Sequence, residues 1–303
     1  MINVTKPLLQ ESAVALGLFD GVHLGHQRVL ASAVQCRQEG LLPCAFTFDA
    51  SAFPKKHGVE LEFLYTEDHK QRLFEDMGIE AVLTVNFSDI KEMDGESFCR
   101  DILKVKLNAK KVFCGSDFKF GKDAACGFAE LALFGKNMGF EAICVESVCI
   151  GDLDVSSTRI REYLNTGCPE KAQELLGRPY SVSGIVIHGR ALGRTIDFPT
   201  INQSFQKGQL VPARGVYLSR VSLPDGRKYF GLTNVGVKPT VSDENLPLAE
   251  THILDFKGDL YGQYCTTELL CFIRPEKKFE NIKALQTAIM QDIENIRRLA
   301  IFI

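Results

Sequence analysis

The sequence predicts a two-domain α/β protein, in which a parallel sheet covered by helices is followed by a small antiparallel β-barrel and a C-terminal helix. From residue 13 to about 165, short apolar runs alternate with longer amphipathic ones, a pattern typical of a parallel sheet covered on both faces. After about residue 178, strand-like runs follow one another without intervening helices, which favours a barrel. The length of 303 residues also fits two domains better than one hydrophobic core.

The first half contains five short apolar runs that we expect to be strands. They are Ala13–Leu18, Pro43–Phe48, Ala81–Val85, Lys111–Cys114 and Ala142–Val145. Helices are expected over residues 24–39, 66–77, 95–106 and 127–138. The first run has neither a basic leader nor a small-residue cleavage site, so we interpret it as a strand rather than a signal peptide. Parallel sheets of this kind bind ligands beyond the carboxyl ends of their strands.

The second half contains five further strand-like runs, separated by turn signals such as Pro224-Asp225-Gly226. The runs cover residues 181–188, 215–222, 228–235, 251–256 and 264–273. A final helix is expected over about 280–300, where apolar residues recur near helical spacing. These residues are Ile282, Leu285, Ile289, Ile293 and Ile296. The boundary is placed at Leu176–Pro179, so that the domains are residues 1–178 and 179–303.

Composition restricts the class of protein. The net charge of −3 gives no general attraction to nucleic acid, so anionic substrates must be held by local groups. No apolar run approaches the length of a membrane span. Ten cysteines are present without a C-x-x-C pair, and five of them lie inside apolar stretches: Cys36, Cys44, Cys114, Cys144 and Cys271. We interpret them as reduced, buried thiols of a cytoplasmic protein and not as zinc ligands.

The segment Gly17–His26, G-L-F-D-G-V-H-L-G-H, joins the first expected strand to the first expected helix. Its glycines, Gly17 and Gly25 among them, let the backbone approach a ligand closely, and a helix N-terminus attracts phosphate. His23 and His26 are three residues apart, so both can face one side of a helical turn and donate to phosphate oxygens in a transition state. A glycine-rich turn with two surface histidines is the alternative.

A second candidate segment is Val155–Arg161, V-S-S-T-R-I-R. The hydroxyls of Ser157 and Thr158 at a helix start can cap the helix and can also meet phosphate. Arg161 can bind phosphate through two hydrogen bonds. Simple capping beside solvated arginines is the alternative.

A third candidate segment is Gly115–Gly121, G-S-D-F-K-F-G, which follows an expected strand. Aromatic rings such as those of Phe118 and Phe120 are suited to lie beside a flat heterocycle. A packed loop with a capping aspartate at Asp117 is the alternative.

The second half has its own candidate loop, in which Gly189 and Gly193 precede Pro199-Thr200-Ile201-Asn202. The sequence contains no G-x-x-x-x-G-K-[ST] motif, so a P-loop kinase is excluded. The Thr200 hydroxyl and the Asn202 amide oxygen are hard ligands suited to Mg²⁺. An ordinary hairpin ending at a proline is the alternative.

Together these segments resemble a known family. The H-x-G-H and S-S-T-x-x-R segments resemble the motif pair of the adenylyltransferase superfamily, and Gly115–Gly121 resembles the G-x-D-F-x-F-G loop of bacterial FAD synthetases. The P-T-I-N loop, the strand containing Glu250-Thr251-His252 and the segment Arg274-Pro275-Glu276 resemble riboflavin kinase. Residues 13–300 as a whole are similar to the prokaryotic bifunctional riboflavin kinase/FAD synthetases.

The resemblance implies a Rossmann-like nucleotidyltransferase domain and a riboflavin kinase barrel, with riboflavin, FMN and ATP as substrates and Mg²⁺ as cofactor. It implies four catalytic residues: Glu250, His23, His26 and Arg161. It implies ATP or phosphate contacts from Gly17, Phe19, Asp20, Gly25, Ser157, Thr158, Gly189, Gly193, Thr200 and Asn202. It implies flavin contacts from Asp117, Phe118, Phe120, Tyr261, Arg274 and Glu276. Thr200 and Asn202 would also hold the metal.

Chemistry distinguishes the two reactions. The FMN phosphate is already largely ionised at neutral pH, because its second pKa is about 6, so its adenylation needs only positioning and charge stabilisation. A ribityl hydroxyl needs a carboxylate to accept its proton, and the resemblance assigns that role to Glu250. Three alternatives stay open: a kinase with a degenerate first domain, a flavin-binding regulatory module, and another nucleotidyltransferase fused to a barrel. Oligomeric state also stays open.

Overall fold

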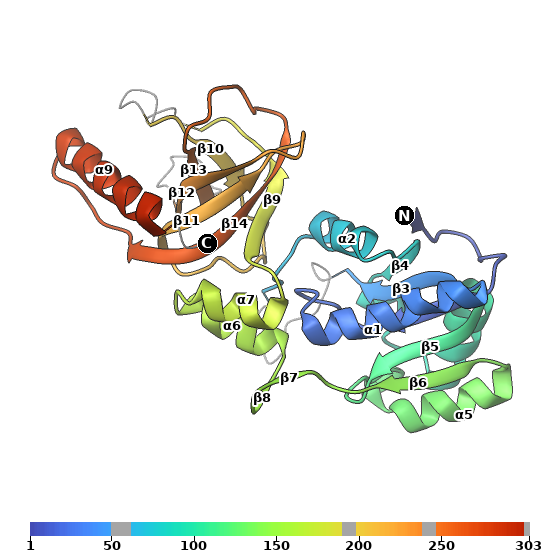
Figure 1. Ribbon diagram of the computed structural model, residues 1–303. Coiled ribbons are helices and arrows are strands. Elements are labelled where there is room, and N and C mark those ends of the chain that lie inside the picture. Colours follow the sequence, from blue (N-terminus) through green and yellow to red (C-terminus); the bar gives the residue numbers. More distant parts are fainter. Residues whose placement is uncertain (50–61, 190–197, 238–246, 300–303) are drawn as a thin grey trace. The chain divides into compact units, whose positions relative to one another are not determined.

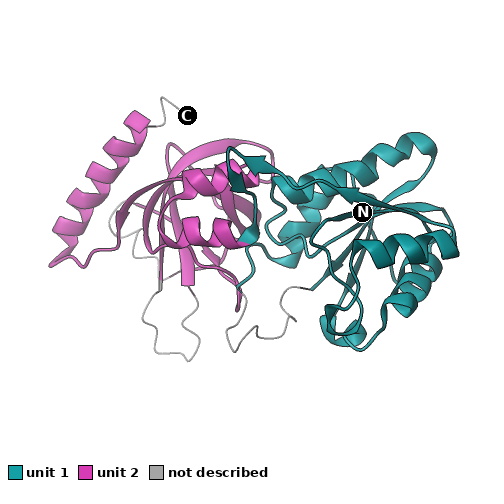
Figure 2. Cartoon of the chain, turned by 90° about the horizontal axis from the view of Figure 1, so that it is seen from below, with its two compact units in different colours: residues 1–157 teal, residues 158–303 magenta. Residues whose placement is uncertain are grey.

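The computed structural model describes residues 1–49, 62–189, 198–237 and 247–299 (Figure 1). The chain divides into two compact units, residues 1–157 and 158–303 (Figure 2). This division falls before the expected boundary at 178, because two helices are grouped with the second unit. They are α6 (Ser157–Asn165), apart from its first residue, and α7 (Pro169–Leu176).

The first unit contains a six-stranded sheet whose neighbouring strands are all parallel, in the order β1-β4-β3-β2-β5-β6. The strands are β1 (Ile2–Asn3), β2 (Ser12–Leu16), β3 (Leu42–Phe48), β4 (Ala81–Val85), β5 (Ala109–Gly115) and β6 (Glu141–Val145). The parallel sheet and its five longer strands confirm the expectation. Only β1 was not expected, because two residues carry no periodic pattern.

Helices cover both faces of this sheet (Figure 1). They are α1 (Leu24–Gln35) with η1 (Cys36–Glu39), α2 (Glu67–Asp76), α3 (Phe87–Ile90), α4 (Gly95–Ser97) with η3 (Phe98–Lys106), η4 (Lys122–Ala124) and α5 (Phe128–Met138). Alternate residues of β2 enter two different cores, Val14 in one and Ala15 in the other. The Val14 core contains η3 and α5, and the Ala15 core contains α1 and α2. This two-sided burial explains why the strands are almost uniformly apolar.

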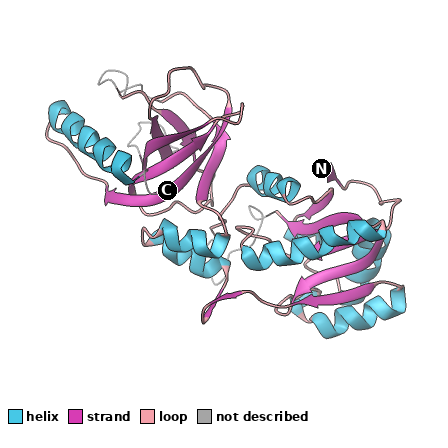
Figure 3. Cartoon of the chain, viewed as in Figure 1, coloured by secondary structure: helices cyan, strands magenta, loops and turns pink. Residues whose placement is uncertain are grey.

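The second unit contains an antiparallel sheet, drawn in magenta in Figure 3. It has six strands in the order β10-β13-β12-β11-β14-β9. The strands are β9 (Tyr180–Ile185), β10 (Ile201–Ser204), β11 (Gly215–Ser222), β12 (Lys228–Val237), β13 (Pro247–Ile253) and β14 (Tyr264–Pro275). The two ends of the sheet meet, because the Ile187 N–H just after β9 donates to the Asn202 carbonyl of β10 at 2.9 Å, and Gln203 Nε2 of β10 donates to the Val182 carbonyl of β9 at 3.4 Å. The sheet therefore curves into the expected barrel.

Two features of the barrel differ from expectation. β10 was not expected, because its sequence I-N-Q-S lacks apolar alternation. Asn202 and Gln203 are both buried, and the Gln203 side chain is hydrogen-bonded to Cys265 and Thr267. β13 was expected over 251–256 and runs from Pro247 to Ile253, so Glu250 lies inside the strand rather than before it.

The expected C-terminal helix is present as α9 (Ile282–Leu299). Ile289, Ile293 and Ile296 pack on an apolar cluster of the barrel, which confirms the predicted apolar face over its second half. Ile282 was expected on that face and is instead 59% exposed, because it lies in the first turn, away from this cluster.

All ten cysteines lie in the described residues and are free thiols. Cys36, Cys44 and Cys114 are buried as expected, and Cys271 is half-buried. Cys144 was expected to be buried and is exposed, because β6 is an edge strand with one neighbour, β5.

Candidate active sites

The loop from Gly17 to His26 begins at the carboxyl end of β2 and leads directly into α1. His23 is the N-cap of α1, and its Nδ1 accepts from the His26 N–H at 3.3 Å. The two imidazole rings stack with centroids 3.5 Å apart and planes 18° from parallel. Both histidines therefore lie together at a helix N-terminus, where unpaired N–H groups and the helix dipole favour an anion.

The ring of Phe19 packs beneath this loop in the core. The ring is buried and meets His26 edge-on at 5.4 Å and Phe74 at 5.6 Å. A Cβ on Gly17 would lie 2.9 Å from the Phe19 ring, so the loop needs glycine at that position. Because the Phe19 side chain belongs to the core, only its backbone is suited to meet a phosphate.

Asp20 connects this loop to other segments of the first unit. Its carboxylate is buried and accepts from the Leu64 N–H at 2.8 Å. Its backbone carbonyl accepts from Ser157 Oγ at 2.8 Å, so this bond joins two motifs 137 residues apart in sequence. Thr158, exposed, and Arg161, half-buried, follow on α6.

The aromatic loop after β5 has one buried and one half-buried ring. Phe120 is buried, packs against Phe98 with centroids 5.3 Å apart, and is held by two backbone hydrogen bonds with Cys126. Phe118 is half-buried and lies 5.9 Å from the Phe120 ring, with the planes 20° apart. Asp117 is exposed. Phe120 thus holds the loop in the core, whereas the side chains of Phe118 and Asp117 remain accessible at the surface.

In the barrel, Glu250 lies between two asparagines on neighbouring strands. The β-ladder sets Glu250 of β13 opposite Asn202 of β10 on one side and opposite Asn234 of β12 on the other. Directly opposite residues of antiparallel strands project on the same face, so the three side chains share one face. Asn234 was not selected from the sequence, although it begins the segment N-V-G-V-K-P-T; its amide donates to Glu276 Oε1 at 3.3 Å.

The Asn202 side chain has the character of a cation ligand. It is 2% exposed, and its Oδ1 has no hydrogen-bond partner in the described part of the chain. Buried oxygens are normally satisfied, and an amide oxygen is a hard ligand, so the residues fit a divalent cation. Thr200 lies two residues earlier, and the adjoining Pro199 carbonyl is held by His252 Nδ1 at 2.9 Å. Gly189 approaches so closely that a Cβ there would lie 2.5 Å from Asn202 Nδ2.

The residues expected on the flavin side of the barrel have protein partners. Tyr261 stacks on His188 with centroids 3.8 Å apart. Arg274 makes three hydrogen bonds to the buried carboxylate of Asp292 on α9, the shortest at 2.7 Å. Glu276 accepts from Asn234, as described above. Gly193 lies outside the described residues.

Comparison with known proteins places this architecture in a family. The riboflavin kinase model matches residues 176–300, and the FAD synthetase model matches residues 5–159. A bifunctional riboflavin kinase/FMN adenylyltransferase from Haemophilus influenzae is 35% identical over 295 residues, covering 96% of this chain and 94% of the relative. The chain belongs to the bifunctional riboflavin kinase/FMN adenylyltransferase family.

Other relatives agree with this family. The bifunctional riboflavin kinase/FMN adenylyltransferase of Bacillus subtilis is 34% identical and covers 96% of this chain and 95% of its own. A crystal structure described as a macrolide-efflux protein from Streptococcus pneumoniae shares the fold with a TM-score of 0.84 at 30% identity, covering 98% and 99% of the two chains. Across the described residues, no helix combines the length and apolarity that crossing a bilayer requires.

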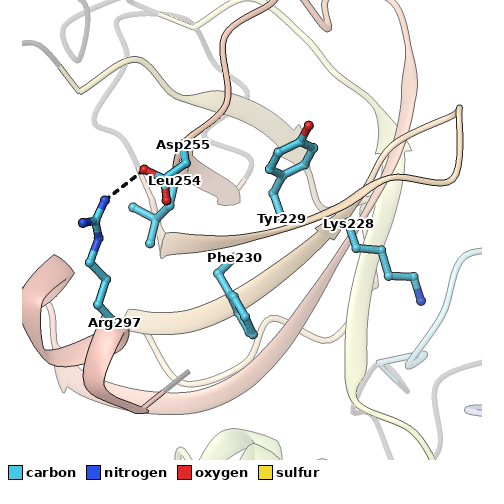
Figure 4. Close-up of a pocket in the computed structure, with 6 residues that line it drawn as sticks. All are labelled: Lys228, Tyr229, Phe230, Leu254, Asp255 and Arg297. Carbon is cyan, nitrogen blue, oxygen red and sulfur yellow. Dashed lines mark hydrogen bonds and ion pairs between the residues drawn. The ribbon is translucent and has the colours of Figure 1, made fainter. Parts of the chain in front are cut away.

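A pocket of about 270 Å³ lies elsewhere on the family's kinase half (Figure 4). Its lining residues come from β12, the two residues after β13, and α9; they are Lys228, Tyr229, Phe230, Leu254, Asp255 and Arg297. Arg297 Nη2 donates to Asp255 Oδ1 at 3.0 Å at one side of the pocket. None of the residues expected to bind ATP or flavin lines it.

Proposed function

We propose that the second half of the chain phosphorylates riboflavin to FMN with ATP, and that the first half transfers AMP from ATP to FMN, forming FAD and pyrophosphate. The observation that carries the proposal is the register of β13, which sets Glu250 opposite the buried Asn202 in the half that matches riboflavin kinase. A base and a metal ligand are the two groups that phosphoryl transfer to an alcohol requires. The ten free thiols support a cytoplasmic location.

In the kinase half, Glu250 accepts the proton of the ribityl hydroxyl while its oxygen attacks the γ-phosphorus and ADP leaves. Thr200 and Asn202 would hold Mg²⁺, which supplies charge neutralisation of the phosphates when bound. Gly189 would let the backbone approach ATP closely, and Gly193, which lies outside the described residues, stays a predicted ATP contact. Hydroxyl and amide oxygens are hard donors, which suit Mg²⁺ better than softer cations such as Zn²⁺.

In the adenylyltransferase half, a phosphate oxygen of FMN attacks the α-phosphorus of ATP, and pyrophosphate leaves. No general base is needed, because the nucleophile is already ionised. His23 and His26 donate to the oxygens whose charge grows, and Arg161, Ser157 and Thr158 of α6 bind phosphate. The backbone of Gly17, Phe19, Asp20 and Gly25 forms the loop around the nucleotide.

The isoalloxazine ring system would contact different residues in the two halves. Phe118 and Asp117 are suited to the adenylyltransferase half, with Phe120 supporting them from the core. Tyr261, Arg274 and Glu276 are suited to the kinase half. Because Arg274 and Glu276 already have protein partners, we infer that they order the flavin side as much as they touch the ligand.

Chromatography of the reaction products tests the proposal directly. Purified protein incubated with riboflavin, ATP and Mg²⁺ should produce FMN first and FAD later. FMN without FAD would contradict the adenylyltransferase assignment and favour a kinase with a degenerate first domain. Absence of both products would contradict the enzyme assignment and favour a flavin-binding module.

Two substitutions should separate the reactions. Glu250→Ala should lower FMN formation by about a hundredfold or more and leave the conversion of supplied FMN to FAD unchanged. His26→Ala should lower FAD formation by a similar factor and leave FMN formation unchanged. Loss of both reactions from either substitution, in a chain that still unfolds cooperatively, would contradict the assignment of two separate sites.

A further inference from the structure

Lys70 of α2 is a buried charged residue outside the motifs discussed above. It is 3% exposed, and lysine is rarely buried unless its charge is paired and its hydrogen-bonding groups are satisfied. Its Nζ pairs with Glu67 Oε2 at 2.8 Å and donates to the Phe48 carbonyl at 2.9 Å and to Thr47 Oγ1 at 3.3 Å. An ammonium group has three protons, so each has an acceptor in this arrangement.

The contacts of Lys70 continue into the Gly17–His26 loop. Thr47 Oγ1, which accepts from Lys70, donates its own proton to the Leu18 carbonyl at 2.9 Å. At the other end, Thr84 Oγ1 of β4 donates to Glu67 Oε1 at 3.2 Å. The network therefore runs along the carboxyl ends of β4 and β3 to the loop that follows β2. This carboxyl edge of the sheet is where parallel sheets bind ligands.

The end of this network determines the direction of one peptide group. Leu18 and Phe19 share a planar trans peptide, in which the carbonyl and the N–H point in opposite directions. Holding the Leu18 carbonyl toward Thr47 therefore turns the Phe19 N–H the other way. Phe19 has a φ of +53°, a left-handed conformation that non-glycine residues adopt only where their surroundings enforce it.

We propose that Lys70 is a positioning residue of the adenylyltransferase reaction: through the Thr47 hydroxyl it holds the Leu18–Phe19 peptide so that the Phe19 N–H faces the ATP phosphates. This inference rests on the proposed function of the Gly17–His26 loop. Chains of hydrogen bonds strengthen one another, so the Lys70 ammonium makes the Thr47 hydroxyl a better donor to Leu18. Lys70 acts on the loop without touching the nucleotide.

Substitutions of Thr47 test the link with little change in volume. Thr47→Val removes the hydroxyl and keeps the shape, whereas Thr47→Ser keeps the hydroxyl. We expect Thr47→Val to lower kcat/KM for ATP in FAD formation by about tenfold to a hundredfold, with a higher KM for ATP and an unchanged KM for FMN. Thr47→Ser should recover most of that loss. A purely structural defect would lower the amount of active enzyme and leave both KM values unchanged.

A double-mutant cycle tests whether Lys70 acts through Thr47. Lys70→Met should lower kcat/KM for ATP by a factor similar to that of Thr47→Val. Both changes break the same chain of contacts. The kcat/KM for ATP of the double variant should therefore lie within about twofold of that of the less active single variant. Riboflavin phosphorylation by the same chains is the internal control and should stay within about twofold of the unsubstituted protein.

Three results would overturn the inference: an unchanged KM for ATP in Thr47→Val, no recovery in Thr47→Ser, or losses in the double variant that equal the product of the single losses. If Lys70→Met fails to fold, the Thr47 pair alone still decides between the outcomes. Failure of the proposed function is distinguishable, because the unsubstituted chain would then form no FAD from supplied FMN. If all variants formed FAD normally, the positioning role of Lys70 and Thr47 would be wrong, and the adenylyltransferase function would be unaffected.

Discussion

At the scale of single residues, Asn202 is the side chain on which the proposed metal site of the barrel depends. Its amide oxygen is buried without a partner in the described residues, and leaving such a group unsatisfied costs about 1–3 kcal/mol. Its backbone carbonyl accepts from the Ile187 N–H, which fixes the main chain from which the side chain projects. A buried oxygen kept at this cost is consistent with a cation that binds there in the reaction.

Gly189→Ala should displace that oxygen. The new Cβ would lie 2.5 Å from Asn202 Nδ2 and 2.8 Å from Oδ1, so the amide group must move. We expect riboflavin kinase kcat/KM to fall by about tenfold to a hundredfold and the Mg²⁺ concentration for half-maximal activity to rise. FAD formation from supplied FMN should be unchanged.

Gly184→Ala is the matched control for that substitution. A Cβ at Gly184 of β9 would meet nothing within 4 Å, so kinase activity should not change. Equal kinase activity in the two variants would contradict the role of Asn202.

At the scale of secondary-structure elements, α9 is attached to the barrel by one apolar cluster and two ion pairs, of which Arg297–Asp255 is exposed and Arg274–Asp292 is largely buried. Arg274 at the end of β14 donates three hydrogen bonds to Asp292 of α9, and the side chains are 17% and 6% exposed. Ile289, Ile293 and Ile296 pack nearby on the barrel. Removing one partner from a buried pair leaves the other charge unpaired, which is strongly destabilising.

Asp292→Ala should therefore lower the free energy of unfolding of the second unit by about 2–4 kcal/mol, as measured by urea denaturation. Glu294→Ala on the same helix is the control, because Glu294 pairs with Arg298 on the exposed surface. That control should change stability by less than about 0.5 kcal/mol. Similar decreases in the free energy of unfolding in both variants would contradict a larger contribution from the Arg274–Asp292 pair.

At the scale of the whole molecule, both units bury thiols in apolar surroundings. Burial raises the pKa of four of them to about 12: Cys44, Cys99, Cys114 and Cys271. Cys144 and Cys149 are exposed. The hydrogen bond from Cys149 to Asp154 raises the pKa of the Cys149 thiol. Because the thiolate is the reactive form, burial and raised pKa values both protect a thiol.

Alkylation of the native protein with iodoacetamide near pH 7.5, followed by peptide mass spectrometry, tests this distribution. Cys144 should be modified first and Cys149 more slowly, whereas the four thiols of highest pKa should react only after denaturant is added. Rapid native labelling of Cys44 or Cys114 would contradict the described core of the first unit.

The sequence by itself determined the order and type of most elements and the two families of motifs. Strand and helix patterns depend on local periodicity, and motifs such as Gly17–His26 are continuous in the chain. The resemblance also named Glu250 and Asn202 as partners in one reaction. These inferences need no knowledge of which distant segments touch.

Only the tertiary structure decided which side chains meet. It set Glu250 opposite Asn202 through a polar strand without apolar alternation, put the Phe120 ring into the core, and paired Arg274 with Asp292. It also buried Lys70 and linked it through Thr47 to the Leu18 carbonyl, which the polar sequence of its helix does not indicate. The physical reason is that strand register and burial arise from packing between segments far apart in the chain, which local patterns of residues do not encode.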